Sequence, residues 1–451
     1  MLTLLVVLLL GAPLLLVALA DSRRAVLLVL LVGGLPISML SGPSIPLGPF
    51  GVLQPQAFYL LAILASLAIA VFQSTDPLAG TARSMTFYFA FLAYAAVSCA
   101  WSADLGEGIR FLFKLLAPAL MLVAARHCLA SDADRRLAEA CILACCGMVT
   151  TLALLDRAGG GWMSPDSASF AAQGILTAPY MSPANFSFLV GTGALVALAR
   201  YLRDRAPMQL LASAAFAAAV MLAFTRISMA GLVVAGALLV FLGARDATSR
   251  YLVPTAIVVA GVAAALTSER VRARFFFGGD LGTSNGAGVA GLLENLDTSG
   301  RTTLWTEALQ SMGGRSEAFG AGLGSVDHWL NLGGGVNALH SEMLRIYIDT
   351  GALGLALFVA GLAQIGYVLW RSASTAARSR TQVRSALACA ALAYYGATLM
   401  TDNSLNYVSE FGLYVFALAG IALSPSTEGV ATQRPRAPVG DPKPRYPNLL
   451  R

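Results

Sequence analysis

The sequence predicts an all-α protein that crosses a membrane many times. Hydrophobic residues make up 57% of the 451 residues and charged residues only 12%, whereas a soluble domain carries about 25% charged residues. Apolar runs follow one another closely, and the roughly ten-residue alternation of a membrane barrel is absent. Because lipid offers the backbone no hydrogen bonds, helices are the spanning elements that fit this pattern.

Thirteen apolar runs approach the length of about 20 residues that a membrane-spanning helix needs. Several are short, so their ends should extend into the adjoining loops, and the sequence predicts 12 or 13 transmembrane helices. The first run ends like a signal-peptidase site, but no Lys or Arg precedes it, and we expect it to be a helix. The runs are residues 2–20, 25–40, 57–72, 85–101, 108–125, 137–156, 185–199, 207–225, 227–243, 251–267, 352–370, 385–401 and 407–423.

These runs divide the chain into four parts. Residues 1–267 hold the N-terminal helices, residues 268–351 form the one long polar interval, and residues 352–423 hold the C-terminal helices. Residues 424–451 are rich in Pro, Arg and Gly and should form a disordered tail. All six cysteines lie outside the long interval, which argues against structural disulfides and a cysteine metal site.

The distribution of Lys and Arg predicts the orientation. Twenty of the 30 basic residues fall in one set of alternate loops and in the tail, so that side should be cytoplasmic and residues 268–351 extracytoplasmic. The side of the N-terminus depends on whether all 13 runs span. The net charge of +6 therefore reflects topology and does not indicate nucleic-acid binding. Ten basic residues lie at the outer side, against the usual bias: Arg110, Lys114, Arg157, Arg226, Arg270, Arg272, Arg274, Arg301, Arg315 and Arg345.

Two of these outer arginines are candidates for binding an anion. Arg226 lies between two apolar runs with no room for a loop, where a lone arginine is either a snorkelling anchor or functional. Arg301 opens a predicted helix in which Leu304, Trp305 and Leu309 should face a core or the bilayer. An arginine near a helix N-terminus is poorly placed for the helix dipole unless an anion such as a phosphate binds there. The alternative is a solvated loop arginine.

His340 is the candidate general base. Asn337 is a good N-cap, so His340 should be the third residue of a helix, where the helix dipole disfavours imidazolium. A neutral imidazole can accept a proton, although a lone histidine is more often structural. His328 has no such setting and is assigned to a loop.

Arg110 and Lys114 lie four residues apart and share a helix face. They would either contact a lipid phosphate or snorkel and pair with Glu107. The glycines from Gly313 to Gly335 would allow tight turns and backbone N–H groups that bind anions. Because the chain has no phosphate-binding glycine motif, no zinc-protease motif and no acidic cluster, we expect neither a metal nor a cofactor.

The spaced order of these motifs resembles the signature of the O-antigen ligase superfamily. That group includes lipopolysaccharide O-antigen ligases, Wzy-type polysaccharide polymerases and related protein O-oligosaccharyltransferases. The combination is more specific than any one piece. The resemblance is carried by Thr225-Arg226, Gly300-Arg301 with Leu304-Trp305, Gly320 to Gly324, Ala338-Leu339-His340, and Thr350-Gly351 followed by Gly354.

The resemblance implies a GT-C-like glycosyltransferase in the bacterial inner membrane that uses no metal or nucleotide. It would move a glycan from undecaprenyl diphosphate to an acceptor, a glycan or lipid A-core, at the periplasmic face. Carried over by position, Arg226 and Arg301 would bind the diphosphate and His340 would act on the acceptor hydroxyl. Many relatives have Asn after this histidine; here Ser341 follows, which leaves open the residue that orients His340.

The main alternative is a polytopic transporter or flippase of lipid-linked glycans. A flippase should carry charges in the middle of its helices, whereas the runs here are nearly charge-free and the unexplained cations gather at the outer face. A non-catalytic assembly partner would not need the two arginines and the histidine. Within the enzyme class, the sequence does not separate a ligase from a polymerase.

Overall fold

The computed structural model describes residues 12–34, 45–46, 52–53, 55–73, 81–244, 246–267, 269, 301–310, 316–332, 339–375 and 380–424. Within these ranges the chain is almost entirely helical. The strands found there are one antiparallel pair of two residues each, β1 (Ile45–Pro46) and β2 (Val52–Leu53). The predicted fold class, an all-α polytopic membrane protein, is confirmed.

In this part of the chain, eight helical segments are long and apolar enough to cross a membrane. The first joins α4 (Ala82–Ser98) to the short turn η3 (Cys99–Trp101). The eighth joins the short turns η6 (Ser404–Tyr407) and η7 (Val408–Gly412) to α18 (Leu413–Leu423). The other helices of this set are α5 (Leu105–Cys128), α6 (Asp132–Ala158), α8 (Pro183–Asp204), α10 (Arg226–Gly243), α16 (Glu342–Thr375) and α17 (Arg380–Thr401).

Further helices account for the remaining predicted runs. In three of them the described apolar stretch is shorter: Leu60–Phe72 in α3 (Pro55–Phe72), all of α9 (Pro207–Leu222) and Ala247–Ala263 in α11 (Ala247–Thr267). Residues 12–20 are also helical, and α2 (Ser22–Val32) covers the start of the second predicted run. Parts of both lie outside the described residues, so the total of 12 or 13 spans stays a prediction. The remaining helices are α7 (Pro165–Ala172), α14 (Arg301–Gln310) and α15 (Ser325–Leu332).

Small polar side chains start several of the long helices. Asp104 accepts the backbone N–H of Glu107 at 3.1 Å at the start of α5, and Ser131 accepts that of Asp134 at 3.1 Å at the start of α6. Ser182 does the same for α8, where a proline follows as the first helical residue. These caps satisfy N–H groups that the helix itself leaves unpaired.

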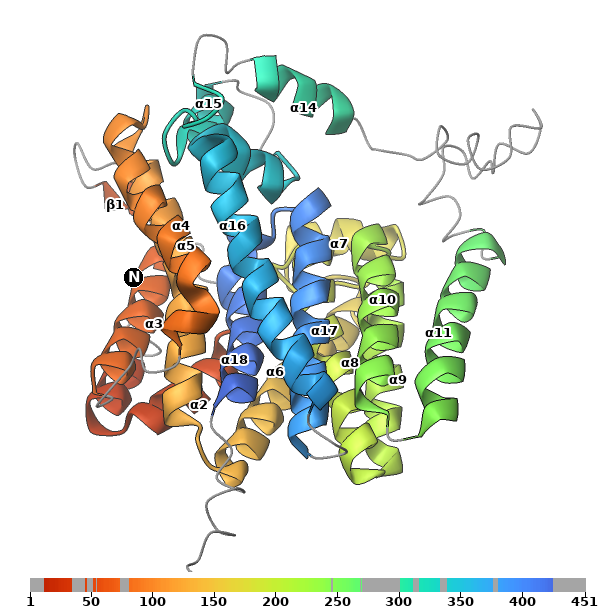
Figure 1. Ribbon diagram of the computed structural model, residues 1–451. Coiled ribbons are helices and arrows are strands. Elements are labelled where there is room, and N and C mark those ends of the chain that lie inside the picture. The colour runs from red at the N-terminus through yellow and green to blue at the C-terminus, as the bar shows by residue number, and fades with distance from the viewer. Residues whose placement is uncertain are drawn as a thin grey trace, which may run out of the picture.

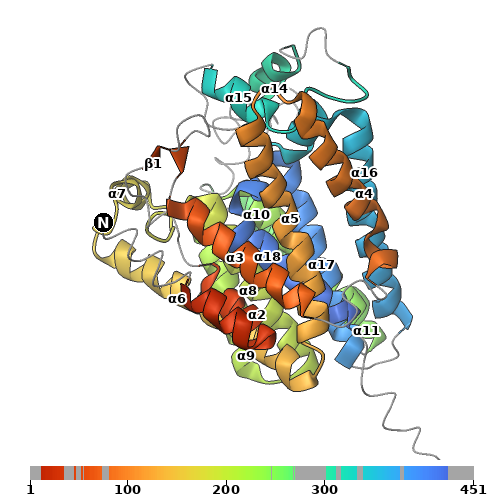
Figure 2. The same ribbon diagram turned by 90° about the vertical axis from the view of Figure 1, so that its left-hand side faces the viewer.

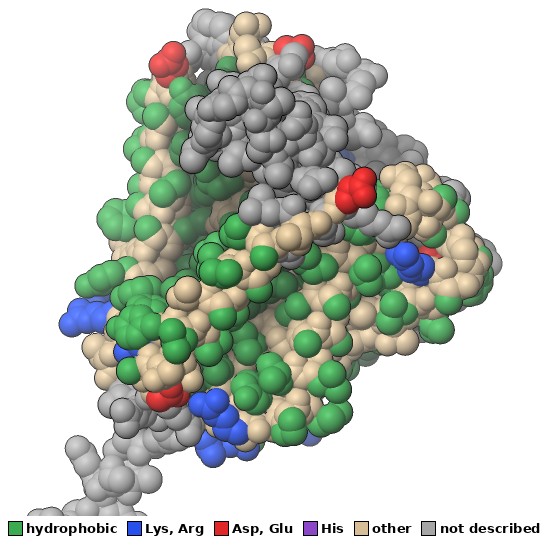
Figure 3. All heavy atoms as spheres, turned by 90° about the vertical axis from the view of Figure 1, so that its right-hand side faces the viewer, with side chains coloured by type: hydrophobic (Ala, Val, Ile, Leu, Met, Phe, Trp, Pro, Cys, Tyr) green, Lys and Arg blue, Asp and Glu red, His purple; other side chains and the backbone are tan. Residues whose placement is uncertain are grey.

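The helices pack as a bundle with α17 and α18 at its centre, and α14 and α15 lie across one end (Figures 1 and 2). α17 packs against α10, α16 and α18, and α18 packs against α5. Aromatic rings pack between neighbouring helices; the ring centroids of Tyr395 on α17 and Phe411 in η7 lie 5.4 Å apart, and those of Phe91 on α4 and Phe358 on α16 5.0 Å. Hydrophobic side chains also cover much of the outer flank (Figure 3), as lipid contact requires.

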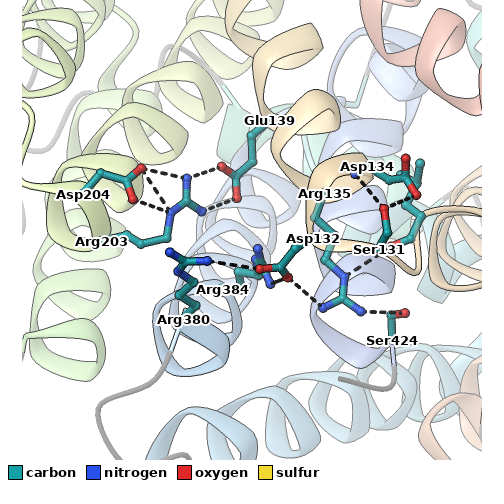
Figure 4. A network of polar contacts seen from close by, with 11 residues as sticks. Ser131, Asp132, Asp134, Arg135, Glu139, Arg203, Asp204, Arg380, Arg384 and Ser424 are labelled. Carbon is teal, nitrogen blue, oxygen red and sulfur yellow. Dashed lines mark hydrogen bonds and ion pairs between the residues drawn. The ribbon is translucent and has the colours of Figure 1, made fainter. Parts of the chain in front are cut away.

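A network of charged side chains ties together the helix ends at the opposite end of the bundle (Figure 4). Arg203 of α8 donates two hydrogen bonds of 2.9 Å to Glu139 of α6, and both side chains are buried. Asp132 accepts from Arg384 of α17 at 2.8 Å, and Arg135 donates to Ser424 after α18 at 3.1 Å. Several arginines of the predicted cytoplasmic loops therefore gather at one end.

α16 is kinked at Gly351, and the glycine-rich segment around Gly320 packs against this kink. Gly351 has φ 69° and ψ −174°, so residues 342–350 form a separate helical stretch before the kink. A Cβ at Gly351 would lie 2.3 Å from the carbonyl oxygen of Ala318. The predicted end of the long polar interval, residue 351, thus coincides with the kink, but the helix already begins at Glu342.

Candidate active site

Residues from three separate segments meet at the C-terminal end of α17. Arg301 is the first residue of α14, as predicted, and its guanidinium donates a hydrogen bond to the carbonyl oxygen of Thr401. His340 comes from the segment before α16, and Asn403 follows α17. Sequence positions about 100 residues apart therefore contribute to one site.

The predicted helical setting of His340 is wrong. α16 begins at Glu342 and Ser341 caps it, accepting the backbone N–H of Leu344 at 3.3 Å. His340 precedes the helix and has φ 54°, in the left-handed region that residues with side chains rarely adopt. Asn337, the expected cap, lies outside the described residues. The backbone at His340 is therefore held in place by tertiary contacts.

Two neighbours supply these contacts. The backbone N–H of His340 donates to Oδ1 of Asn403 at 2.9 Å, and Nδ2 of Asn403 lies 3.4 Å from Nδ1 of the imidazole. On the other side, Nε1 of Trp305 donates to the carbonyl oxygen of Leu339 at 2.8 Å. The histidine is thus fixed between α14 and the segment that follows α17.

The charges around His340 favour its neutral form. Burial lowers the pKa of His340, and the nearby Arg301 guanidinium lowers it further, while Asp402 opposes this. Burial raises the pKa of the Asp402 carboxyl above its ordinary value. A neutral imidazole was expected from a helix dipole; the structure gives burial and an adjacent cation as the causes.

Arg226 lies at the same end of the molecule as Arg301. It opens α10, which packs alongside α17 (Figure 1). Gly231 packs against Tyr394, and Gly243 faces Ala386, so the two helices run antiparallel. Arg226 precedes Gly231 by five residues, or about 7.5 Å along a helix. This places Arg226 at the level of the last turn of α17, to which Arg301 is bonded.

Lys114 and Arg110 have different partners. Nζ of Lys114 donates to Oδ1 of Asn406 at 2.7 Å, in the segment after α17. Arg110 pairs with Glu107 at 2.5 Å, which is one of the two predicted alternatives. Lys114 therefore belongs to the polar cluster beside the site, although its predicted contact with a lipid phosphate stays a prediction.

Two further charged residues complete this cluster. Glu342 is fully buried, and its Oε1 accepts the backbone N–H of Leu405 at 3.2 Å. Arg345 lies 3.5 Å from Oδ1 of Asn406, pairs with Asp327, and stacks 3.7 Å from the ring centroid of Phe111. These contacts hold the segment after α17 against the start of α16.

Residues 402–406 are the part of the site that the sequence reasoning missed. Asp402, Asn403 and Asn406 contribute side chains to the site and its polar cluster. The signal was a short polar stretch, Thr-Asp-Asn-Ser-Leu-Asn, between the two last apolar runs on the predicted outer side. A polar segment this short looks like an ordinary connecting loop in the sequence, because the residues that contact it in space lie far away along the chain.

Residues 211–359 match the O-antigen ligase family. The match spans 149 of the 451 residues and supports membership of this family. It includes Arg226, Arg301 and His340, and it confirms the predicted resemblance. No curated protein matches the chain at a significant level.

The match to the O-antigen ligase family indicates a glycosyltransferase-like membrane enzyme of the ligase or polymerase type. It implies a lipid-linked glycan and an acceptor as substrates, in a membrane setting. The eight apolar helices described above agree with that setting. Asp402 and Asn403 lie outside the matched residues, so the structure adds them to the site.

The glycine-rich part of the O-antigen ligase match binds an acidic side chain that belongs to the protein itself. The Asp349 carboxylate accepts the backbone N–H groups of Gly324 at 3.0 Å and Val326 at 2.9 Å. It thereby serves as the cap at the start of α15. His328 lies on this helix, not in a loop as predicted, and its Nδ1 is 3.8 Å from Asp104.

An apolar groove of about 520 Å³ runs between α16 and α17. It begins at Met343, three residues after His340, and extends past Gly396 and Leu392 to Trp370 near the other end of α16. Its lining is mostly aliphatic and aromatic side chains. The groove thus connects the neighbourhood of the site with the part of the bundle that lipid would surround.

Proposed function

We propose that this protein is a GT-C-like glycosyltransferase that moves a glycan from undecaprenyl diphosphate to an acceptor hydroxyl at the periplasmic face. The observation that carries the proposal is that Arg301 and His340, two residues within the O-antigen ligase match, meet at the end of α17. In a displacement reaction, a fixed cation can stabilise the leaving group and an adjacent neutral imidazole can take the proton of the attacking hydroxyl.

The proposed reaction needs no metal. The acceptor oxygen forms a bond to the anomeric carbon of the donor while its proton passes to His340. The bond from that carbon to the phosphate oxygen breaks, and its electron pair leaves with the lipid diphosphate. Arg226 and Arg301 stabilise the negative charge that develops there, because fixed guanidinium groups bind phosphate with charge-assisted hydrogen bonds.

The groove between α16 and α17 would hold the lipid chain of the donor. It is apolar, and it begins next to the segment that carries His340. A Cβ at Gly396, in the groove wall, would contact no other atom within 4 Å. Gly396→Leu should therefore extend into the groove from a Cβ that meets no neighbour, and should raise KM for the lipid-linked donor several-fold.

The matched control is Gly147→Leu on α6, where a Cβ would also meet nothing within 4 Å. Initial rates at varied donor concentration measure both variants. An unchanged KM in Gly396→Leu, or an equal rise in Gly147→Leu, would place the lipid chain elsewhere.

The proposed function is tested by incubating the purified protein with a radiolabelled lipid-diphosphate glycan and a glycan or lipid A-core acceptor. We expect labelled acceptor and free lipid diphosphate in equal amounts, with no loss of rate in excess EDTA. Movement of the intact donor between the leaflets of proteoliposomes, without transfer, would favour the transporter instead. The acceptor that is used distinguishes a ligase from a polymerase.

A further inference from the structure

Asn403 makes two contacts with His340, one with its backbone N–H and one with its imidazole ring. We propose that Asn403 is a positioning residue that keeps the neutral imidazole protonated on Nε2, so that Nδ1 is the atom that takes the proton of the acceptor. This inference deepens the proposed function and rests on it for the identity of the acceptor. Ser341 stands where many relatives have the Asn that follows the histidine, and the proposal assigns the orienting of His340 to Asn403 instead.

The backbone fixes the orientation of the Asn403 amide. The N–H of His340 can only donate, so the side-chain atom 2.9 Å from it must be the carbonyl oxygen Oδ1. The amide nitrogen Nδ2 then faces the ring, 3.4 Å from Nδ1. Since an amide N–H₂ group can only donate, Nδ1 must present its lone pair, and the single proton of the neutral ring lies on Nε2.

The surroundings hold this arrangement in place. Asn403 is 7% exposed, and its backbone N–H donates to Oδ1 of Asp402 at 2.7 Å. His340 is held on the other side through Leu339, whose carbonyl oxygen accepts from Trp305. The left-handed backbone at His340, φ 54°, directs the N–H and the ring toward the same amide. Neither partner can rotate without losing a hydrogen bond.

The contact between Nδ2 and Nδ1 is longer than an ordinary hydrogen bond of about 2.7–3.2 Å. The contact keeps the lone pair oriented but binds it weakly, so an acceptor hydroxyl can approach Nδ1 while the amide stays bonded to the His340 N–H. The hydroxyl proton then passes to Nδ1 and gives an imidazolium protonated on both nitrogens. The charged groups that face this ring are Arg301, which opposes the imidazolium, and Asp402, which favours it.

The proposal predicts the effect of changing the amide to a carboxylate. In Asn403→Asp both side-chain oxygens can only accept, so the ring should place its proton on Nδ1 and the tautomer should reverse. The added negative charge should also raise the pKa of His340. With the proton on the wrong nitrogen, kcat should fall by about 10²- to 10⁴-fold, whereas KM for the donor should change little.

The test is ¹⁵N NMR of the purified full-length protein labelled at histidine, with the signals of His340 assigned by their loss in His340→Gln. We expect the Nε2–H tautomer in the wild type and the Nδ1–H tautomer in Asn403→Asp. The matched control is Asn406→Asp in the same segment, which contacts Lys114 and not the ring; it should leave the His340 signals unchanged.

An Nδ1–H tautomer in the wild type, or the same tautomer in wild type and Asn403→Asp, would overturn the proposal. If Asn403→Asp fails to fold, Asn403→Ala serves instead, and retention of a single Nε2–H tautomer there would also contradict it. The NMR result does not depend on glycan transfer. Failure of the transfer assay with the expected tautomers would therefore count against the proposed function alone.

Discussion

The backbone of His340 is held by contacts from two other segments of the chain, one before α16 in α14 and one after α17. The local sequence Asn-Ala-Leu-His-Ser-Glu favours a helix start at Asn337, yet the helix begins at Glu342, and His340 takes a left-handed conformation. That conformation depends on Asn403 and Trp305, which no local pattern reveals. A neutral imidazole was expected from a helix dipole that does not act on His340, and the residue that orients the ring had no signal in the local sequence.

The charge of Arg301 should be measurable at His340. Arg301 and burial both keep the pKa of His340 below its ordinary value of about 6.5. In Arg301→Gln one of the two causes is lost, so the pKa of His340 should rise and the imidazolium should persist to higher pH. NMR titration of labelled histidine measures this directly and does not require activity.

The control for this titration is Arg157→Gln, because Arg157 also donates to a backbone carbonyl, that of Gly174, at 2.8 Å. It should leave the His340 titration unchanged. A pKa of His340 that falls or stays constant in Arg301→Gln would show that the two groups do not interact. Because the pKa of folded His340 is depressed, its contribution to stability is present above about pH 6.5 and is lost as the pH falls through the folded value.

At the scale of elements, the sequence predicts the membrane helices well, because lipid forces each apolar run to satisfy its own backbone. The runs at 108–125, 227–243 and 385–401 coincide closely with α5, α10 and α17. The start of α14 at Arg301 was also predicted. The kink at Gly351 and the packing of the glycine-rich segment on it depend on close approaches between segments, which residue periodicity does not encode.

Gly322 lies at one such close approach, between the glycine-rich segment and the backbone of Ser102. It has φ 96°, and a Cβ there would lie 2.4 Å from Cα of Ser102. Gly322→Ala should therefore lower the melting temperature in detergent, because the left-handed backbone costs about 1–2 kcal/mol and the backbone clash adds to it.

Gly160→Ala is the matched control for this substitution. Gly160 has φ 78°, but a Cβ there would contact nothing within 4 Å, so only the backbone strain applies. Thermal unfolding of the two variants separates the clash from the strain. Equal decreases in melting temperature would mean that the segment is not packed on Ser102 as described.

For the whole molecule, the two ends of the bundle differ in their chemistry. The network around Asp132 and Arg203 joins the helix ends on one side, and the site with Arg301 and His340 lies at the other end of α17. This separation agrees with the predicted topology, in which most basic loops are cytoplasmic and the long polar interval is not. The side on which each end lies stays a prediction.

Reporter fusions test that topology. A fusion after Thr283 should show alkaline phosphatase activity, and one at Arg451 should not, because the 20 basic residues of the alternate loops and tail predict a cytoplasmic tail. The reverse pattern, with activity at the tail alone, would place the site in the cytoplasm and exclude a periplasmic reaction.

The central claim is that His340 accepts the proton of the acceptor, and glycan transfer by two histidine variants tests it most directly. Purified His340→Ala should bind the lipid-linked donor nearly as the wild type does, but its rate of transfer should fall by about 10²- to 10⁴-fold, because a general base contributes that much. His328→Ala, on α15 and beside Asp104, should transfer glycan at close to the wild-type rate. Full activity in His340→Ala would contradict the account and leave catalysis to the arginines and substrate positioning.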